Sequence, residues 1–193
     1  EISTDIDALL VALPSTLSQE EMDRLETYIT AGNPTILLVD PLPIIDISLS
    51  PSERAGANTN PFMRNSAPPP KEKGNIGGLM GTLGVSWNIS QIIWDDYNPH
   101  PDLSHLPKEV VFVGAGNDNP DAFNGASAST APLQELVFLF PGHIQPSAMT
   151  DFNFQPLIQS GQISATSMYA QLVQRNFFGG AQLTPPRGLR RHD

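Results

Sequence analysis

The sequence contains no cysteine among its 193 residues. Disulfide bonds, metal sites built on thiolates and a cysteine nucleophile are therefore excluded. The absence is compatible with many compartments, including a bacterial periplasm, and identifies none of them.

Positive charge is also scarce, because 10 Lys and Arg residues stand against 20 Asp and Glu residues, for a net charge of -10. Proteins that bind the nucleic-acid backbone need clustered Lys and Arg. The one basic cluster consists of Arg187, Arg190 and Arg191 in a proline-rich tail, which we interpret as a solvated end. The composition therefore predicts no nucleic-acid partner.

Long apolar runs are missing as well. No segment approaches the roughly 20 apolar residues that a membrane-spanning helix needs, and no signal peptide is present. The sequence begins at Glu1, just ahead of a predicted core strand. We therefore expect a fragment excised from a longer protein, so that missing targeting signals say little about the parent.

The overall composition predicts one folded domain with long irregular segments. Hydrophobic residues make up 39% of the chain, and 19 prolines and 15 glycines accompany them. The length suits a single α/β domain. We predict that this domain spans residues 1–178, with a long loop at about 51–74, and that residues 179–193 form an irregular tail.

The clearest pattern present is a strand, a helix and a second strand between residues 6 and 41. Residues 8–13 are an unbroken apolar run, which is typical of a strand covered on both faces in a parallel sheet. Ser18 and Glu21 form a capping box at the start of an amphipathic helix, and Gly32 suits the left-handed position just past its end. A crossover through one helix makes the second run, 36–39, parallel to the first.

The rest of the chain indicates short strands separated by loops, with little helix. We therefore predict an α/β fold with a mostly parallel sheet, flanking helices and extra strands added at an edge. The expected elements are a short helix at 75–84, an extended stretch at 85–94, strands at 109–113, 136–140 and 152–158, and a helix at 167–174.

Two polar residues follow predicted strands, where binding sites of α/β proteins often lie. They are Asp40 and His143, and we take them as candidate binding residues. Asp40 precedes Pro41 and can equally cap a turn, and a lone histidine is more often structural. A nucleophile elbow for serine hydrolysis is absent. A hydrolase or sugar-active domain that uses these strand ends is the alternative to a non-catalytic domain.

Acidic residues gather between positions 95 and 102. Asp95, Asp96 and Asp102, together with His100, are possible ligands for a divalent cation. The intervening prolines give no regular ligand spacing, so solvated turns are the favoured interpretation. The glycines between 74 and 81 lack the motifs that cradle phosphates. We therefore predict no cofactor.

Several motifs together resemble one known family. They are residues 7–14 (Asp-Ala-Leu-Leu-Val-Ala-Leu-Pro), 17–21, 28–29 and 32–41, and the later segments 76–85, 136–142 and 156–161 follow in the expected order. The chain is similar to the auxiliary, gliding-motility-associated component of uncharacterised ABC-type transport systems over about residues 5–167. It reads Gly-Asn-Pro at 32–34, where the family usually has Gly-Gly-Lys, which indicates a divergent member.

The resemblance implies a fold related to class I glutamine amidotransferases, of the flavodoxin-like type. The nucleophile of that related fold is a cysteine, which this chain lacks. A non-catalytic accessory or interaction role is therefore expected. The resemblance further implies an extracytoplasmic domain of a membrane-anchored bacterial protein, with membrane-embedded ABC transporter subunits or related accessory proteins as partners.

Overall fold

The computed structural model describes residues 2–54, 72–148, 152–175 and 180–184, and all structural statements refer to these. Its helices are α1 (Gln19–Thr30), α2 (Ile76–Thr82) and α3 (Tyr169–Leu172), with single 3-10 turns at Pro14–Thr16, Ile47–Leu49 and Pro101–Leu103. Its strands are β1 (Leu9–Ala12), β2 (Thr35–Leu38), β3 (Val85–Trp87), β4 (Gln91–Asp95), β5 (Val110–Gly114), β6 (Glu135–Leu139), β7 (Ile144–Pro146), β8 (Ser164–Met168), β9 (Val173–Arg175) and β10 (Ala181–Leu183).

The predicted strand–helix–strand unit at the start of the chain is confirmed. β1 and β2 pair in parallel, with Leu9 opposite Thr35. Ser18 donates its backbone N–H to Oε2 of Glu21 at 3.0 Å, as the capping box predicts. Gly32 has a φ of 89°, which is the left-handed conformation expected just past α1.

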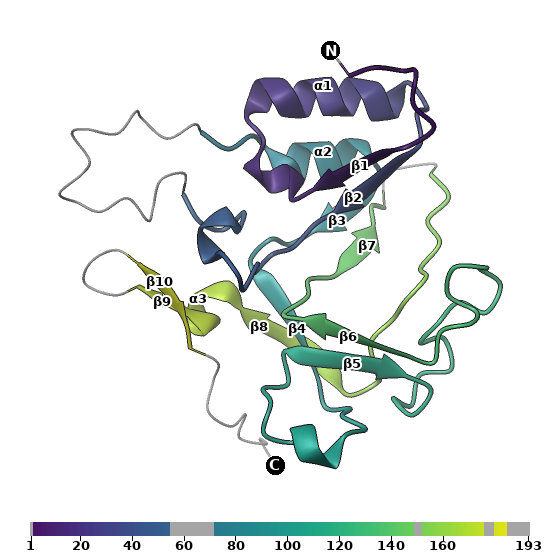
Figure 1. Ribbon diagram of the computed structural model, residues 1–193, viewed down its shortest axis with the longest axis vertical. Coiled ribbons are helices and arrows are strands. Elements are labelled where there is room, and N and C mark those ends of the chain that lie inside the picture. Colours follow the sequence, from purple (N-terminus) through teal and green to yellow (C-terminus); the bar gives the residue numbers. More distant parts are fainter. Residues whose placement is uncertain (1, 55–71, 149–151, 176–179, 185–193) are drawn as a thin grey trace.

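Among the described residues this parallel pair is covered on one face only, and alternate residues of β1 are exposed, so the expectation that both of its faces are buried is wrong. Helices α1 and α2 lie side by side against one face, where Met22 and Leu25 belong to a buried cluster against which Leu9 and other inward-facing side chains pack (Figure 1). On the opposite face Leu10 is 60% exposed. No described helix crosses to that face, which remains an open apolar surface.

The predicted fold class, a mostly parallel sheet with flanking helices in the manner of class I glutamine amidotransferases or flavodoxin, is wrong. Apart from β1–β2, the described strands form antiparallel pairs: β3–β7, β4–β8, β5–β6 and β9–β10. A parallel pair needs a crossover of a dozen or more residues, usually a helix. After β2 the described helices are only seven and four residues long, too short to repeat the opening unit.

Three further expectations differ from the structure. Residues 152–158 form no strand, and Ile158 makes only a single bridge with Phe123. The helix expected at 167–174 shrinks to α3, because the residues on either side extend into β8 and β9. The expected irregular tail contains β10, which pairs with β9. Most of the expected loop at 51–74 falls at 55–71, outside the described residues, and the extent of the domain stays a prediction.

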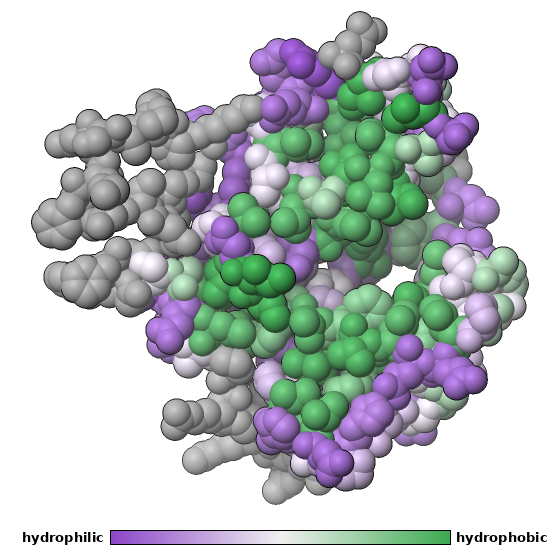
Figure 2. Space-filling view, in the orientation of Figure 1, coloured by the Kyte–Doolittle hydropathy of each residue, from purple (hydrophilic) through white to green (hydrophobic). Residues whose placement is uncertain are grey.

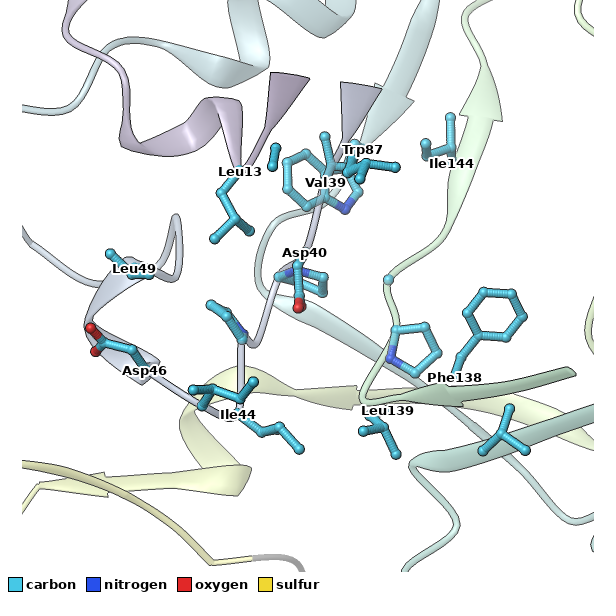
Figure 3. Close-up of a pocket in the computed structure, with 18 residues that line it drawn as sticks. Leu13, Val39, Asp40, Ile44, Asp46, Leu49, Trp87, Phe138, Leu139 and Ile144 are labelled. Carbon is cyan, nitrogen blue, oxygen red and sulfur yellow. The ribbon is translucent and has the colours of Figure 1, made fainter. Parts of the chain in front are cut away.

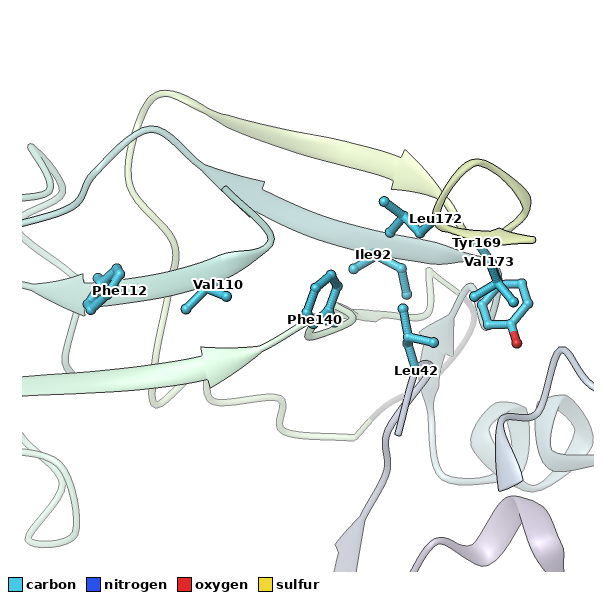
Figure 4. Close-up of a cluster of buried hydrophobic side chains, with 8 residues drawn as sticks. All are labelled: Leu42, Ile92, Val110, Phe112, Phe140, Tyr169, Leu172 and Val173. Carbon is cyan, nitrogen blue, oxygen red and sulfur yellow. The ribbon is translucent and has the colours of Figure 1, made fainter. Parts of the chain in front are cut away.

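A second core joins the segment after β2 to the antiparallel strands (Figure 4). Leu42 and Ile92 are fully buried against Phe140 and Leu172. Ser50 reinforces this junction, because its buried hydroxyl donates to the carbonyl oxygen of Pro41 at 2.6 Å. The ends of β1 and β2 are therefore held close to β6, and this arrangement creates a large cavity.

Candidate functional site

A cavity of about 790 Å³ lies where β1 and β2 end and β6 passes (Figure 3). Its lining is predominantly aliphatic and aromatic, with Leu13, Val39 and Trp87 on one side and Leu139 opposite. Such a volume and lining are in the range of ligand- and peptide-binding clefts. The remaining lining residues are Ala12, Leu38, Asp40, Pro41, Pro43, Ile44, Ile45, Asp46, Leu49, Val137, Phe138, Pro141, Gly142 and Ile144.

Two strained residues shape the ends of the strands at this cavity. Leu13 follows β1 with a φ of 50°, and Phe140 follows β6 with a φ of 52°. Non-glycine residues rarely adopt the left-handed region, and each such residue costs of order 1 kcal/mol or more. Pro14 and Pro141 come directly afterwards. The chain thus turns sharply at both ends of the cavity instead of continuing the strands across it.

Asp40 occupies the middle of the cavity. Its Oδ1 accepts a hydrogen bond of 2.8 Å from the backbone N–H of Leu42, which fixes the carboxylate at the start of the segment after β2. Burial raises the pKa of Asp40 above its ordinary value, although this hydrogen bond acts in the opposite direction. Asp40 thus caps a turn, which is one of the two roles that the sequence left open, and the same residue also lines a cavity.

Apolar side chains continue from the cavity over the neighbouring surface, as the green area in Figure 2 shows. On β1 and β2 they include the open face described above, and Ile45 is completely exposed after β2. We call the cavity together with these side chains the apolar groove. Its exposed members are Leu10, Ile36, Leu38, Ile44, Ile45, Val137, Leu139 and Ile144.

His143 does not join Asp40. It lines a second cavity of about 800 Å³, bordered by β8 and by residues 154–160. Its Nδ1 is buried and has no hydrogen-bond partner among the described residues. The lining of each cavity excludes the other candidate. The structure therefore does not bring Asp40 and His143 together in one concave site.

The acidic candidates for a cation site each have another role. Asp95 is buried, and its carboxylate accepts backbone N–H groups of Tyr97 and Gly161. Asp96 pairs with Lys108. Asp102 lies within the 3-10 turn Pro101–Leu103 and is exposed. Within the described part of the chain, no group of three or more histidine or acidic residues could hold a metal ion.

Sequence reasoning missed two features. One is the buried carboxylate of Glu53, which accepts hydrogen bonds from Tyr169 at 2.9 Å and Arg175 at 2.8 Å. Its partners lie more than 100 residues away, so no local pattern marks it. The other is the apolar groove. The apolar runs of the sequence contain the residues of the groove. A continuous apolar run does not reveal, however, which face of the strand stays uncovered.

Comparison with protein families gives one match, which covers nearly the whole chain. A family model described as "ABC-type uncharacterized transport system" matches residues 1–188. Neither a curated protein nor a solved structure matches the chain. Across the described residues, no helix is both long enough and apolar enough to span a membrane.

Proposed function

Because the chain belongs to the family of ABC-type uncharacterized transport systems, as an auxiliary component, we propose that it is a non-catalytic interaction domain. In this proposal the apolar groove docks onto another subunit of the transport system. The observation that carries the proposal is the exposure of eight large aliphatic side chains, six of which line one cavity while two lie on the outer face of β1 and β2.

The exposure of these side chains argues for a partner. Single exposed apolar residues are normal, but contiguous patches on soluble proteins usually mark interaction sites. Here Leu10 and Ile36 are neighbours in the β1–β2 register, and Leu38 continues the same face. The apolar groove is therefore a continuous surface, and covering it would remove a large apolar area from water.

The arrangement of polar groups supports a non-catalytic role. General acid–base or nucleophilic chemistry needs at least two reactive groups within hydrogen-bonding reach of one substrate. Asp40 and His143 line separate cavities. The other carboxylate in the cavity of Asp40 is that of Asp46, which already accepts the N–H and the hydroxyl of Ser48. Cysteine, a common nucleophile, does not occur in the chain.

The proposal also covers the cellular location of the domain and the process that it serves. Its support on these two points is the sequence resemblance. We place the domain on the extracytoplasmic side of the membrane, in a membrane-anchored bacterial protein, and expect a link to gliding motility. Protease treatment of intact spheroplasts tests the location, because an extracytoplasmic domain is digested without lysis. The link to gliding motility is tested by the gliding of cells that carry the groove variant, which is the double substitution Leu38→Asp with Leu139→Asp.

The docking surface is tested in the full-length parent protein in its native membrane. A double substitution, Leu38→Asp with Leu139→Asp, places two charges in the groove, and we expect it to abolish co-purification of the transporter subunits. The matched control is Ile163→Asp, which charges an aliphatic side chain that is 61% exposed outside the groove. Unchanged co-purification with the folded double variant would overturn the proposal.

A further inference from the structure

We propose that the apolar groove binds an extended apolar segment of a partner protein that carries a lysine or arginine, and that this cation pairs with Asp40. The inference rests on the proposed function, because it takes the groove to be the docking surface. It adds the chemical character of the segment that docks there.

The charged groups of the groove are of one sign. Asp40 and Asp46 line the cavity, and none of the described residues that line it is Lys, Arg or His. Asp46 already accepts two hydrogen bonds from Ser48, one from its backbone N–H at 3.0 Å and one from the Ser48 hydroxyl at 2.6 Å. The chain as a whole carries a net charge of -10. Electrostatic complementarity therefore favours a positively charged occupant.

The position of Asp40 also favours a positively charged occupant. Its carboxylate lies in the middle of the cavity, between Leu13 and Leu139 (Figure 3). Oδ1 is held by the N–H of Leu42, so Oδ2 is the oxygen left for an occupant. A purely apolar occupant would remove this carboxylate from water without a partner, which is costly. A lysine or arginine supplies a charge-assisted hydrogen bond at that point.

The apolar surface extends beyond the cavity in a way that fits a polypeptide. Leu10 and Ile36 lie on the outer face of β1 and β2, away from the cavity lining. On β6, Val137 and Leu139 are exposed at alternate positions. An extended segment of about ten residues spans about 33 Å and points alternate side chains to one face. In this proposal the segment runs from one set of residues to the other, with its basic residue over Asp40.

Fluorescence anisotropy with synthetic peptides tests the inference. The probe is a labelled peptide of about ten residues, alternating leucine and serine, with one central arginine, and its matched partner has glutamine at the centre. We expect the arginine peptide to bind the wild-type chain about tenfold more tightly than the glutamine peptide. Asp40→Asn, which keeps an acceptor for Leu42, should abolish this preference. Asp46→Asn removes a negative charge at the edge of the groove, and this variant should retain the preference for the arginine peptide.

The possible outcomes separate this inference from the proposed function. Equal binding of the two peptides, or a preference that survives Asp40→Asn, overturns the inference. Failure of both peptides to bind also overturns the inference. In that case the proposed function is still supported if the groove variant no longer co-purifies with the transporter subunits. A preference that depends on Asp40, combined with unchanged co-purification of the groove variant, overturns the proposed function and supports the cationic segment alone.

Discussion

Gly161 donates its backbone N–H to Oδ2 of Asp95 over 2.6 Å, so the loop before β8 is fixed directly onto the last residue of β4. A Cβ atom on Gly161 would lie 2.7 Å from the carbonyl oxygen of Asn117 and 3.1 Å from both Asp95 oxygens. Contacts this short force the backbone to move. The role of Asp95 is therefore to hold a loop in place through backbone hydrogen bonds.

The substitution Gly161→Ala is expected to destabilise the chain by about 1–3 kcal/mol, as overpacking typically does. Urea denaturation followed by circular dichroism measures this change. Gly81→Ala is the control, because a Cβ there meets nothing within 4 Å. Gly81 lies inside α2, where alanine is favoured over glycine by about 0.8–1 kcal/mol, so the control should gain stability. Equal effects at the two positions would contradict the close approach to Asp95.

The buried carboxylate of Glu53 provides a second prediction. It is 4% exposed, and the hydroxyl of Tyr169 is one of its hydrogen-bond donors. Tyr169→Phe leaves part of this carboxylate without a partner and should cost about 1–3 kcal/mol in thermal or urea unfolding. Tyr28→Phe is the matched control, because the buried Tyr28 hydroxyl has no hydrogen-bond partner among the described residues. The control should be neutral or slightly stabilising.

Neighbouring residues of β2 test the one-sided coverage of the parallel pair. Leu37 contacts the core beneath α1, whereas Leu38 is half-exposed in the apolar groove. We expect Leu37→Ala to cost about 2 kcal/mol and Leu38→Ala to cost less than about 0.5 kcal/mol. The two unfolding curves, measured in parallel, decide the matter. A similar cost at both positions would mean that the outer face is covered in solution.

Local sequence patterns were sufficient for the first unit of the fold. The capping box of Ser18 and Glu21 and the glycine at 32 depend on residues close together in the sequence, so their conformations followed from local physics. The parallel pairing of β1 and β2 followed from the helix between them. The family resemblance also rested largely on this unit, and the family match over residues 1–188 agrees with it.

The remainder could not be derived in this way, because it depends on distant pairings. β4 pairs with β8 across about seventy residues, with Asp95 opposite Ser164, and nothing in either segment specifies the other. For the site, Asp40 was recognised as a strand-end residue, but its cavity depends on β6, about a hundred residues later. The apolar face of β1 and β2 suggested burial on both sides, because hydrophobicity alone does not tell a core face from a docking face.

The charge of Asp40 provides a prediction about pH. Burial raises the pKa of this carboxyl above its ordinary value of 3.8, so the folded state holds the proton more tightly than the unfolded state. The contribution of protonated Asp40 to the free energy of unfolding is fully present below pH 3.8. It is lost as the pH rises through the pKa that Asp40 has in the folded state. Ionised Asp40 therefore reduces the stability of the chain at neutral pH.

Asp40→Asn removes this titration and keeps an oxygen that accepts the N–H of Leu42. We expect the variant to be more stable than the wild type at neutral pH and to lose that advantage as the pH falls through the folded-state pKa of Asp40 toward 3.8. Thermal unfolding of both proteins across this pH range measures the difference. Salt at about 0.5 M should leave the neutral-pH difference largely intact, because burial causes it and salt screens mainly exposed charges. A wild type that is the more stable protein at neutral pH would show that a cation already compensates Asp40 within the folded chain.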